Sequence, residues 1–452
     1  MREQLPVERT VSRGLNIRTS ATSARRVILL ILTAFSLVSY VQRMNISIAA
    51  KYMMPELSLS DIQMGQIFSS FMLGYALFQV PAGILGDRLG PRFLLTASTC
   101  WCGIATLLTG AIPGLVIKDE VAIFTSLIVL RFLLGVGAAA TYPVAARAIA
   151  NWIPVLKRGV SNAIVVAGLS VGAAITPPLI SFFMVKFGWR VSFYVSSSFA
   201  FLVAIAWRWY ATDHPKQNPR VSQKELDLIL GAQGQATPNG LDLAGWRRGL
   251  RSKAVWLLSV SYFFSGYVLF IFVFWFFLYL VEVRGFSILS GGFFTSLPFV
   301  ISTVLTPFGG TLSDFFSAKL GRRWGRRIVA ISGFGLSAIF LFWGLKADDP
   351  YLAIAALSLS VGFEQFTEGA FWSTAIDIAG PYAGAIAGLM NMAGNLGGVV
   401  STALVPILVS QFGWTFALGT GSVLALVAGL IWFGIQSDHE ISSQNPKLLH
   451  AA

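Results

Sequence analysis

The chain has 452 residues, of which 55% are hydrophobic and 12% charged, and its mean hydropathy is +0.70. A soluble domain carries about 25% charged residues, so this composition excludes a soluble enzyme, a nucleic-acid-binding protein and a secreted disulfide-bonded scaffold. The net charge of +13 lies mainly in short polar segments between apolar ones. That placement is typical of membrane orientation signals.

Twelve apolar segments predict twelve transmembrane helices, because each is long enough to cross a hydrocarbon layer of about 30 Å. The first segment lacks a small-residue cleavage site, so we expect it to be retained as a membrane helix. The approximate spans are 27–49, 62–86, 93–113, 120–152, 159–187, 190–211, 254–283, 288–315, 328–346, 351–378, 382–411 and 414–435.

The predicted fold is an all-α membrane protein of two six-helix bundles. A polar stretch separates them, in which Ser222 and Glu225 form a capping box at the start of a short surface helix. The predicted parts are an N-terminal tail (1–26), a first bundle (27–211), a linker (212–252), a second bundle (253–436) and a C-terminal tail (437–452).

The two halves repeat one another. Gly188-Trp189 recurs 225 residues later as Gly413-Trp414, and Gly172 matches Gly397 at the same offset. Duplicated halves are the architecture of rocking transporters, whose site lies between the halves near the middle of the membrane. With the N-terminal tail counted as internal, Lys and Arg number 24 in the internal segments and 6 in the external loops. This asymmetry predicts a plasma (inner) membrane protein with both termini in the cytoplasm.

The loop Gly83-Ile-Leu-Gly-Asp87-Arg88-Leu-Gly90-Pro-Arg92 has a counterpart in the second half with Gly310, Asp314 and Arg322. This pair of loops resembles the G-x-x-x-D-R-x-G-x-R pattern of the major facilitator superfamily. The resemblance covers residues 25–436. It implies a carrier that works by alternating access, for which a monomer suffices.

Further motifs are similar to the anion:cation symporter branch of that superfamily: Tyr40-Val-Gln-Arg43-Met-Asn45, the linker DHPKQNPRVSQKE and GLMNMAGNLGG. The branch implies a small organic anion as substrate, such as a sugar acid, and a coupled cation. The acid that usually precedes the first-helix arginine is Gln42 here, and the usual fourth-helix Glu corresponds to Ala138. These departures weaken the case for proton symport.

Arg43 and Arg131 lie deep in apolar segments, where a charged side chain costs about 2.5–3.5 kcal/mol. A guanidinium can bind a carboxylate or phosphate bidentately, so we predict that Arg43 holds an anionic substrate with Arg131 in support. Hydrogen bonding to carbonyls and water in a cavity is the alternative. The further substrate-binding candidates are Tyr40, Gln42, Tyr75, Ser373 and Asn391.

Glu364 and Glu368 are the two carboxylates well inside the second half, and their i, i+4 spacing puts them on one face of a helix. Such a pair could take up a proton, or hold a sodium ion through its oxygens. The alternative is that both pair with arginines or line a wet vestibule. We therefore predict no cofactor other than a possible coupling H⁺ or Na⁺. The sequence contains no His or Cys cluster typical of a metal site.

Acidic and basic residues at the predicted cytoplasmic face are gating candidates, because rocking breaks and remakes such contacts. They are Asp87, Arg88, Arg92, Asp314 and Asp377. Two rival functions stay open: a uniporter or exchanger of organic anions or phosphate esters, and a membrane sensor. A membrane-embedded enzyme is disfavoured, because the chain contains neither a P-loop nor a His or Cys cluster typical of a metal site.

Overall fold

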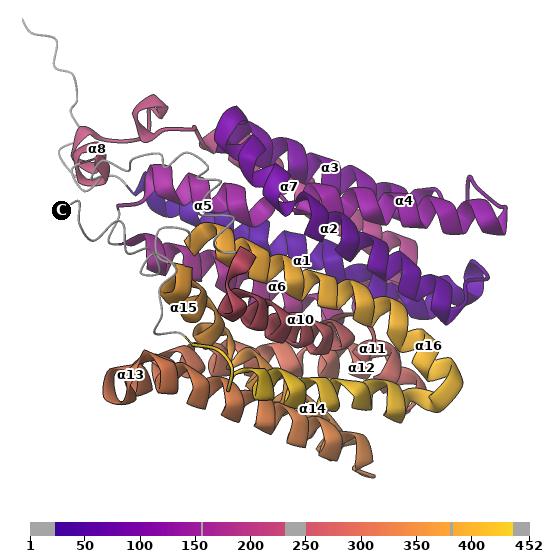
Figure 1. Cartoon of the computed structure of the whole chain (residues 1–452). Coiled ribbons are helices and arrows are strands. Elements are labelled where there is room, and N and C mark those ends of the chain that lie inside the picture. The colour runs from indigo at the N-terminus through magenta and orange to yellow at the C-terminus, as the bar shows by residue number, and fades with distance from the viewer. Residues whose placement is uncertain (1–22, 155–156, 231–249, 380–382, 437–452) are drawn as a thin grey trace, which may run out of the picture.

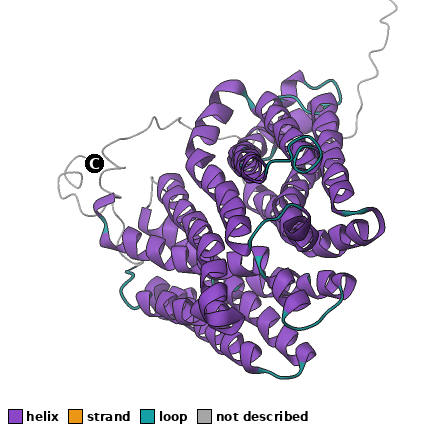
Figure 2. Ribbon diagram, turned by 90° about the vertical axis from the view of Figure 1, so that its right-hand side faces the viewer, coloured by secondary structure: helices purple, strands orange, loops and turns teal. Residues whose placement is uncertain are grey.

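The computed structural model describes residues 23–154, 157–230, 250–379 and 383–436. Nearly the whole of the two predicted tails and residues 231–249 of the predicted linker lie outside these ranges. The described residues fold into α-helices joined by short turns, without a β-strand among them. Two groups of helices lie side by side when the molecule is viewed end-on (Figure 2).

The helices before the linker belong to the first half of the chain. They are α1 (Ala24–Glu56), α2 (Asp61–Leu89), α3 (Pro91–Ala111), α4 (Glu120–Ala138), α5 (Thr141–Trp152), α6 (Arg158–Phe187) and α7 (Trp189–Tyr210). The linker contains a short 3₁₀ turn and α8 (Gln223–Leu230). The second half contains α10 (Lys253–Phe274), α11 (Phe276–Glu282), α12 (Ile288–Thr295), α13 (Leu297–Lys346), α14 (Pro350–Gln365), α15 (Glu368–Ala379) and α16 (Ala383–Ile431).

Twelve spans follow from these helices. Nine helical stretches of the described residues are long and apolar enough to cross a membrane. Two of them, α12–α13 and α16, contain two spans each, because the backbone reverses at Gly321 and Gly413. The broken helix α14–α15 supplies the remaining span. The predicted all-α fold with twelve membrane helices is confirmed.

Glycines make the tight reversals between consecutive spans. Gly90 and Gly188 in the first half have φ of 81° and 86°, and Gly321 and Gly413 in the second half have 83° and 80°. A side chain is strongly disfavoured at such positive φ. The two halves therefore use glycine at matching turns, as the Gly188–Gly413 repeat predicted.

Matching glycines also bring matching helices together. A Cβ on Gly172 of α6 would lie 2.7 Å from the Leu37 carbonyl oxygen of α1, and one on Gly397 of α16 would lie 2.0 Å from the Phe263 carbonyl oxygen of α10. The close pairs α1–α6 and α10–α16 are therefore equivalent in the two halves. In Figure 1 the indigo and magenta helices of the first half lie above the red and orange helices of the second.

The molecule has two ends that differ in their contacts. We call the end that carries α8 and the turn at Gly321 the motif face, on the left of Figure 1, and the other end the opposite face. At the opposite face Lys51 of α1 and Glu282 of α11 form an ion pair of 2.9 Å between the halves. Farther in, the Phe68 and Phe274 rings pack with centroids 4.9 Å apart. These contacts join the halves at the opposite face.

The linker helix α8 begins after Ser222, as predicted, and the Glu225 N–H donates to the Ser222 hydroxyl at 3.3 Å. The Glu225 carboxylate, however, accepts hydrogen bonds of 3.2 Å from the backbone N–H groups of Ala24 and Arg25. The Glu225 side chain, predicted to help cap its own helix, thus also caps the first turn of α1.

Candidate functional site

Arg43 lies in the interior of α1 inside a cluster of aromatic side chains. Its guanidinium carbon is 5.0 Å from the ring centroid of Tyr40, 5.3 Å from that of Phe71 and 4.5 Å from that of Tyr75. Aromatic faces stabilise a cation in such positions. The side chain is only 4% exposed. The cluster therefore holds a positive charge between α1 and α2.

The Arg43 guanidinium is not saturated by these neighbours. The hydroxyl groups of Tyr40 and Tyr75 lie within hydrogen-bonding reach of the guanidinium, and that of Tyr142 interacts with it electrostatically. Its Nε and one terminal nitrogen, Nη2, nevertheless find no hydrogen-bond acceptor at acceptable geometry among the described residues. No Asp or Glu carboxylate of the described chain lies within ion-pair distance of it either. Unsatisfied donors of a buried guanidinium are unusual and costly.

Arg131 of α4 has a different environment. It is fully buried, and its two terminal nitrogens donate to the Gln42 carbonyl oxygen and to the Asn45 side-chain oxygen, both at 3.1 Å. Its guanidinium carbon also lies 5.5 Å from the Phe193 ring centroid. Arg131 therefore ties α4 to the turn of α1 that carries Arg43, and in this conformation it is out of reach of a substrate.

The other substrate-binding candidates lie at different depths. The side-chain amide of Asn391 on α16 donates to the Gln79 amide oxygen on α2 at 3.0 Å, so this pair bridges the two halves. Gln42 is buried, and its side-chain nitrogen has no hydrogen-bond partner among the described residues. Ser373 lies half-buried on α15. The structure thus brings Tyr40 and Tyr75 to Arg43 and places Asn391 on the other half.

Glu364 and Glu368 flank the break between α14 and α15. Glu364 is fully buried and accepts hydrogen bonds from the Ser265 hydroxyl and from the Gln365 side-chain amide, the latter at 2.7 Å. Glu368 accepts from the Tyr262 hydroxyl at 3.1 Å and from the Trp372 indole at 2.7 Å. Neither carboxylate has a Lys, Arg or His partner within 4 Å in the part of the chain that is described.

The gating candidates form ion pairs within each half. Asp87 lies 3.6 Å from Arg147, and both side chains are exposed. In the second half Arg326 lies 2.7 Å from Asp314 and 3.6 Å from Asp377. Between residues 23 and 436, outside the undescribed gaps, each ion pair at the motif face stays within its own half.

The other two arginines of the first-half motif differ from one another. Arg92 donates from its backbone N–H to the Asp213 carboxylate at 2.8 Å and from its side chain to the Arg208 carbonyl at 2.8 Å. Arg88 is exposed at the end of α2. Arg92 therefore fastens the start of α3 to the end of α7 and the linker, rather than to the second half.

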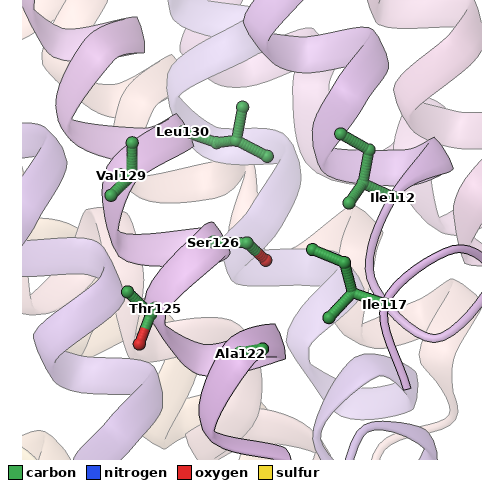
Figure 3. A pocket seen from close by; sticks show the side chains of 7 residues that line it. All are labelled: Ile112, Ile117, Ala122, Thr125, Ser126, Val129 and Leu130. Atoms are coloured by element: carbon green, nitrogen blue, oxygen red, sulfur yellow. The ribbon is translucent and has the colours of Figure 1, made fainter. Parts of the chain in front are cut away.

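A surface groove of about 380 Å³ lies away from these residues, between α4 and the segment that follows α3. Its two hydroxyl groups, on Thr125 and Ser126, already donate to carbonyls of the preceding turn. The groove is therefore apolar and suits a lipid chain better than an anion. Figure 3 shows the side chains that line it: Ile112, Ile117, Ala122, Thr125, Ser126, Val129 and Leu130.

Several side chains of the site were not among the predicted candidates. Phe71 precedes Tyr75 by one helical turn, so the i, i+4 spacing on one helix face was available as a signal. Tyr142, whose hydroxyl lies 3.1 Å from that of Ser36, comes from α5. Gln79, Tyr262 and Ser265 contact site residues from other helices. Such contacts between distant helices have no local signal in the sequence.

The fold and the charged residues buried within its membrane helices define an integral membrane transporter. The profile of the Major Facilitator Superfamily matches residues 32–401 and 312–449, so the chain belongs to the Major Facilitator Superfamily and is not an enzyme. It is 33% identical over 390 residues to a probable sulfoacetate transporter of Cupriavidus necator, covering 86% of this chain and 88% of that protein.

A hexuronate transporter of Bacillus subtilis is 30% identical over 412 residues, which cover 89% of this chain and 92% of the relative. These relatives match the anion:cation symporter branch. The fold is similar to that of a bacterial homologue of the human lysosomal transporter Spinster in an inward-facing, occupied conformation. For that structure the TM-score is 0.74, the identity 17%, and the match covers 95% of this chain and 99% of the other.

Proposed function

We propose that this chain is a secondary carrier that moves a small organic anion, a sugar acid or a related carboxylate, by alternating access. The observation that carries the proposal is Arg43, a buried guanidinium between α1 and α2 with two donor nitrogens that lack an acceptor at acceptable geometry and with no acidic partner in the described chain. A carboxylate can accept both donors in parallel. The relatives named as sulfoacetate and hexuronate transporters support an organic anion.

In this proposal Arg43 binds the anionic group of the substrate, and Arg131 acts by positioning the α1 turn through its two hydrogen bonds. Tyr40 and Tyr75 offer rings and hydroxyl groups to a polar body such as a sugar. Asn391 would bind from the second half once its hydrogen bond to Gln79 opens. Gln42 and Ser373 are secondary candidates for the same site.

We further propose that the motif face is cytoplasmic and that the protein works as a monomer in the plasma membrane. The positive charges of its loops support this orientation. The relatives support transport of an organic anion, and cation coupling is proposed because the anion:cation symporter branch that the chain resembles implies it. A uniporter or an exchanger, for example of phosphate esters, is the second candidate, because Gln42 and Ala138 occupy the positions of the usual acids of the branch.

The test is binding and uptake by purified protein. We expect D-glucuronate or sulfoacetate, and not glycerol 3-phosphate, to raise the thermal midpoint in detergent. Arg43→Ala should weaken binding by at least about thirtyfold, because truncating one partner of a buried charge pair costs about 2–5 kcal/mol. The control is Arg208→Ala, whose side chain is exposed on α7. Normal affinity in a folded Arg43→Ala protein would refute the site.

A further inference from the structure

Glu364 is a carboxylate whose surroundings contain no compensating cation. It is fully buried, and its two hydrogen-bond donors, Ser265 and Gln365, are neutral. A buried carboxylate in neutral surroundings is stable only when it can bind a proton or pair with a cation. We propose that Glu364 is the site at which this carrier takes up and releases a coupling proton. The inference rests on the proposed anion site at Arg43.

The titratable groups around Glu364 are few. Glu368 follows on α15, Tyr262 faces both carboxylates from α10, and Tyr40 interacts with Glu364 from α1. The α16 helix that packs against α15 contains no titratable residue between Ala383 and Ile431. The charged residues of α13 lie around its central turn, where Arg326 pairs with Asp314 and Asp377, and at its last residue, Lys346. None of these forms an ion pair with Glu364, and neither does Arg43, the cation on α1 whose guanidinium packs on the Tyr40 ring.

The donors around the pair favour a proton over a metal ion. A sodium ion requires several oxygen acceptors directed at one point. Here the Gln365 amide and the Trp372 indole direct N–H groups at the two carboxylates. An N–H donor repels a cation. A proton, in contrast, binds to one oxygen of the carboxyl group, and the other oxygen can still accept the N–H hydrogen bond. The described residues also hold no group of three or more His, Cys, Asp or Glu that could bind a metal.

Glu364 lies next to a break in a membrane helix, so a change in its protonation can affect the conformation of the second half. It is the second-last residue of α14, and the helix breaks immediately after it at Phe366 and Thr367, before α15 begins at Glu368. Broken helices form ion sites in many transporters because the break can change when the halves rock. A change of charge at Glu364 therefore acts at a hinge of the second half.

Glu364 also faces the proposed anion site. Its carboxylate interacts electrostatically with Tyr40, whose ring packs on the Arg43 guanidinium. A negative charge on Glu364 opposes the entry of an anion beside Tyr40, and a bound proton removes that opposition. By linkage, anion binding favours proton binding equally. The expected result is symport of one proton with each anion.

The experiment uses the full chain in proteoliposomes with labelled D-glucuronate and sulfoacetate. For the wild type we expect accumulation driven by an inward proton gradient, and an affinity that falls about tenfold per pH unit above the midpoint of the titration. Glu364→Gln should retain anion exchange at equilibrium and lose both the gradient-driven accumulation and the pH dependence. Asp348→Asn, which neutralises an exposed carboxylate on a loop, is the matched control.

The results separate this inference from the proposed function. If Glu364→Gln still accumulates anion on a proton gradient, or if Glu368→Gln alone abolishes coupling, the assignment to Glu364 is wrong while the anion site stands. Accumulation of the anion driven by a sodium gradient at constant pH would show that sodium is the coupling ion and would overturn the assignment of a proton. Absence of any anion binding by the wild type would instead overturn the proposed function, and with it this inference.

A second variant keeps the test decisive if Glu364→Gln does not fold. Ser265→Ala removes one hydroxyl donor from the carboxylate and leaves its ability to titrate. Because the charged form loses a hydrogen bond, the midpoint of the pH dependence should move to higher pH. An unchanged midpoint in a folded, active Ser265→Ala protein would contradict the proposal.

Discussion

At the scale of single residues, two buried arginines of one half have opposite surroundings. Both terminal nitrogens of Arg131 donate to neutral acceptors of α1 and only its Nε lacks an acceptor in the described chain, whereas Arg43 has two donor nitrogens without an acceptor at acceptable geometry among aromatic rings. A buried charge is tolerated when its hydrogen bonds are made. The difference therefore separates a residue that positions α1 from one that is available to a ligand.

Arg131→Lys tests that separation. Lysine keeps the charge but cannot reach two acceptors in the planar arrangement of a guanidinium. We expect the loss of one charged hydrogen bond to cost about 1.5–3 kcal/mol of folding free energy, seen as a lower thermal midpoint. Anion affinity should fall as well, since the α1 turn that carries Arg43 is less well held.

A positioning role is identified by comparing the thermal stability of Arg131→Lys and wild type in the presence of saturating anion. If Arg131 only positions Arg43, saturating anion should restore much of the lost thermal stability, because a bound anion holds Arg43 in place. If Arg131 instead touches the substrate, saturating anion will stabilise the variant far less than the wild type. Tryptophan fluorescence during heating measures both quantities.

Arg43 and Glu364 could be predicted from the sequence because a charged residue within an apolar segment is conspicuous. Their surroundings could not. The rings of Phe71 and Tyr75 reach Arg43 from α2, and the Ser265 hydroxyl reaches Glu364 from α10. The role of Arg131 was also open, because its acceptors are a backbone carbonyl and an asparagine that became neighbours only through the packing of α4 on α1.

At the scale of elements, the membrane helices are interrupted where side chains of the site lie. The fourth span breaks between α4 and α5, and the tenth breaks between α14 and α15. Continuous apolar segments predicted the spans but not these breaks. The linker helix α8 is an element of another kind, since it fastens the start of α1 through Glu225.

Glu225→Ala should destabilise the first half. The carboxylate is fully buried and accepts from the first two backbone N–H groups of α1. A helix N-terminus that loses its acidic cap loses about 0.5–2 kcal/mol. We expect a lower thermal midpoint in detergent, while Asp227→Ala, at an exposed position of the same helix, should change stability by less than about 0.5 kcal/mol. Equal midpoints for the two variants would show that the cap contributes nothing.

At the scale of the whole molecule, the ion pair that joins the described parts of the two halves lies at one end, and the Asn391–Gln79 hydrogen bond bridges the halves farther toward the motif face. The Lys51–Glu282 ion pair and the Phe68–Phe274 contact cross the interface at or near the opposite face, while the ion pairs of the motif face stay within each half. In a rocking carrier, contacts that join the halves at one end must break before that end opens. We therefore predict that the Lys51–Glu282 ion pair acts as a gate at the opposite face.

Lys51→Ala should shift the protein toward the state that is open at the opposite face. Lys51 interacts with Asp61 as well as with Glu282, so its removal leaves two carboxylates without their shared cation. Exposed ion pairs contribute about 0.2–1 kcal/mol, which corresponds to an increase of about 1.4-fold to fivefold in the open population. A cysteine in place of Thr402, which is fully buried against Gly65, reports opening through its rate of maleimide labelling.

The labelling is carried out in a background without Cys100 and Cys102, with reagent added from the side of the opposite face. The exchanged pair Lys51→Glu with Glu282→Lys should return the rate to within about twofold of the parent, because the attraction across the interface is restored. If the single substitution leaves the rate unchanged, the ion pair does not hold the gate. In that case the packing of Phe68 against Phe274 and Trp275 must supply the closure.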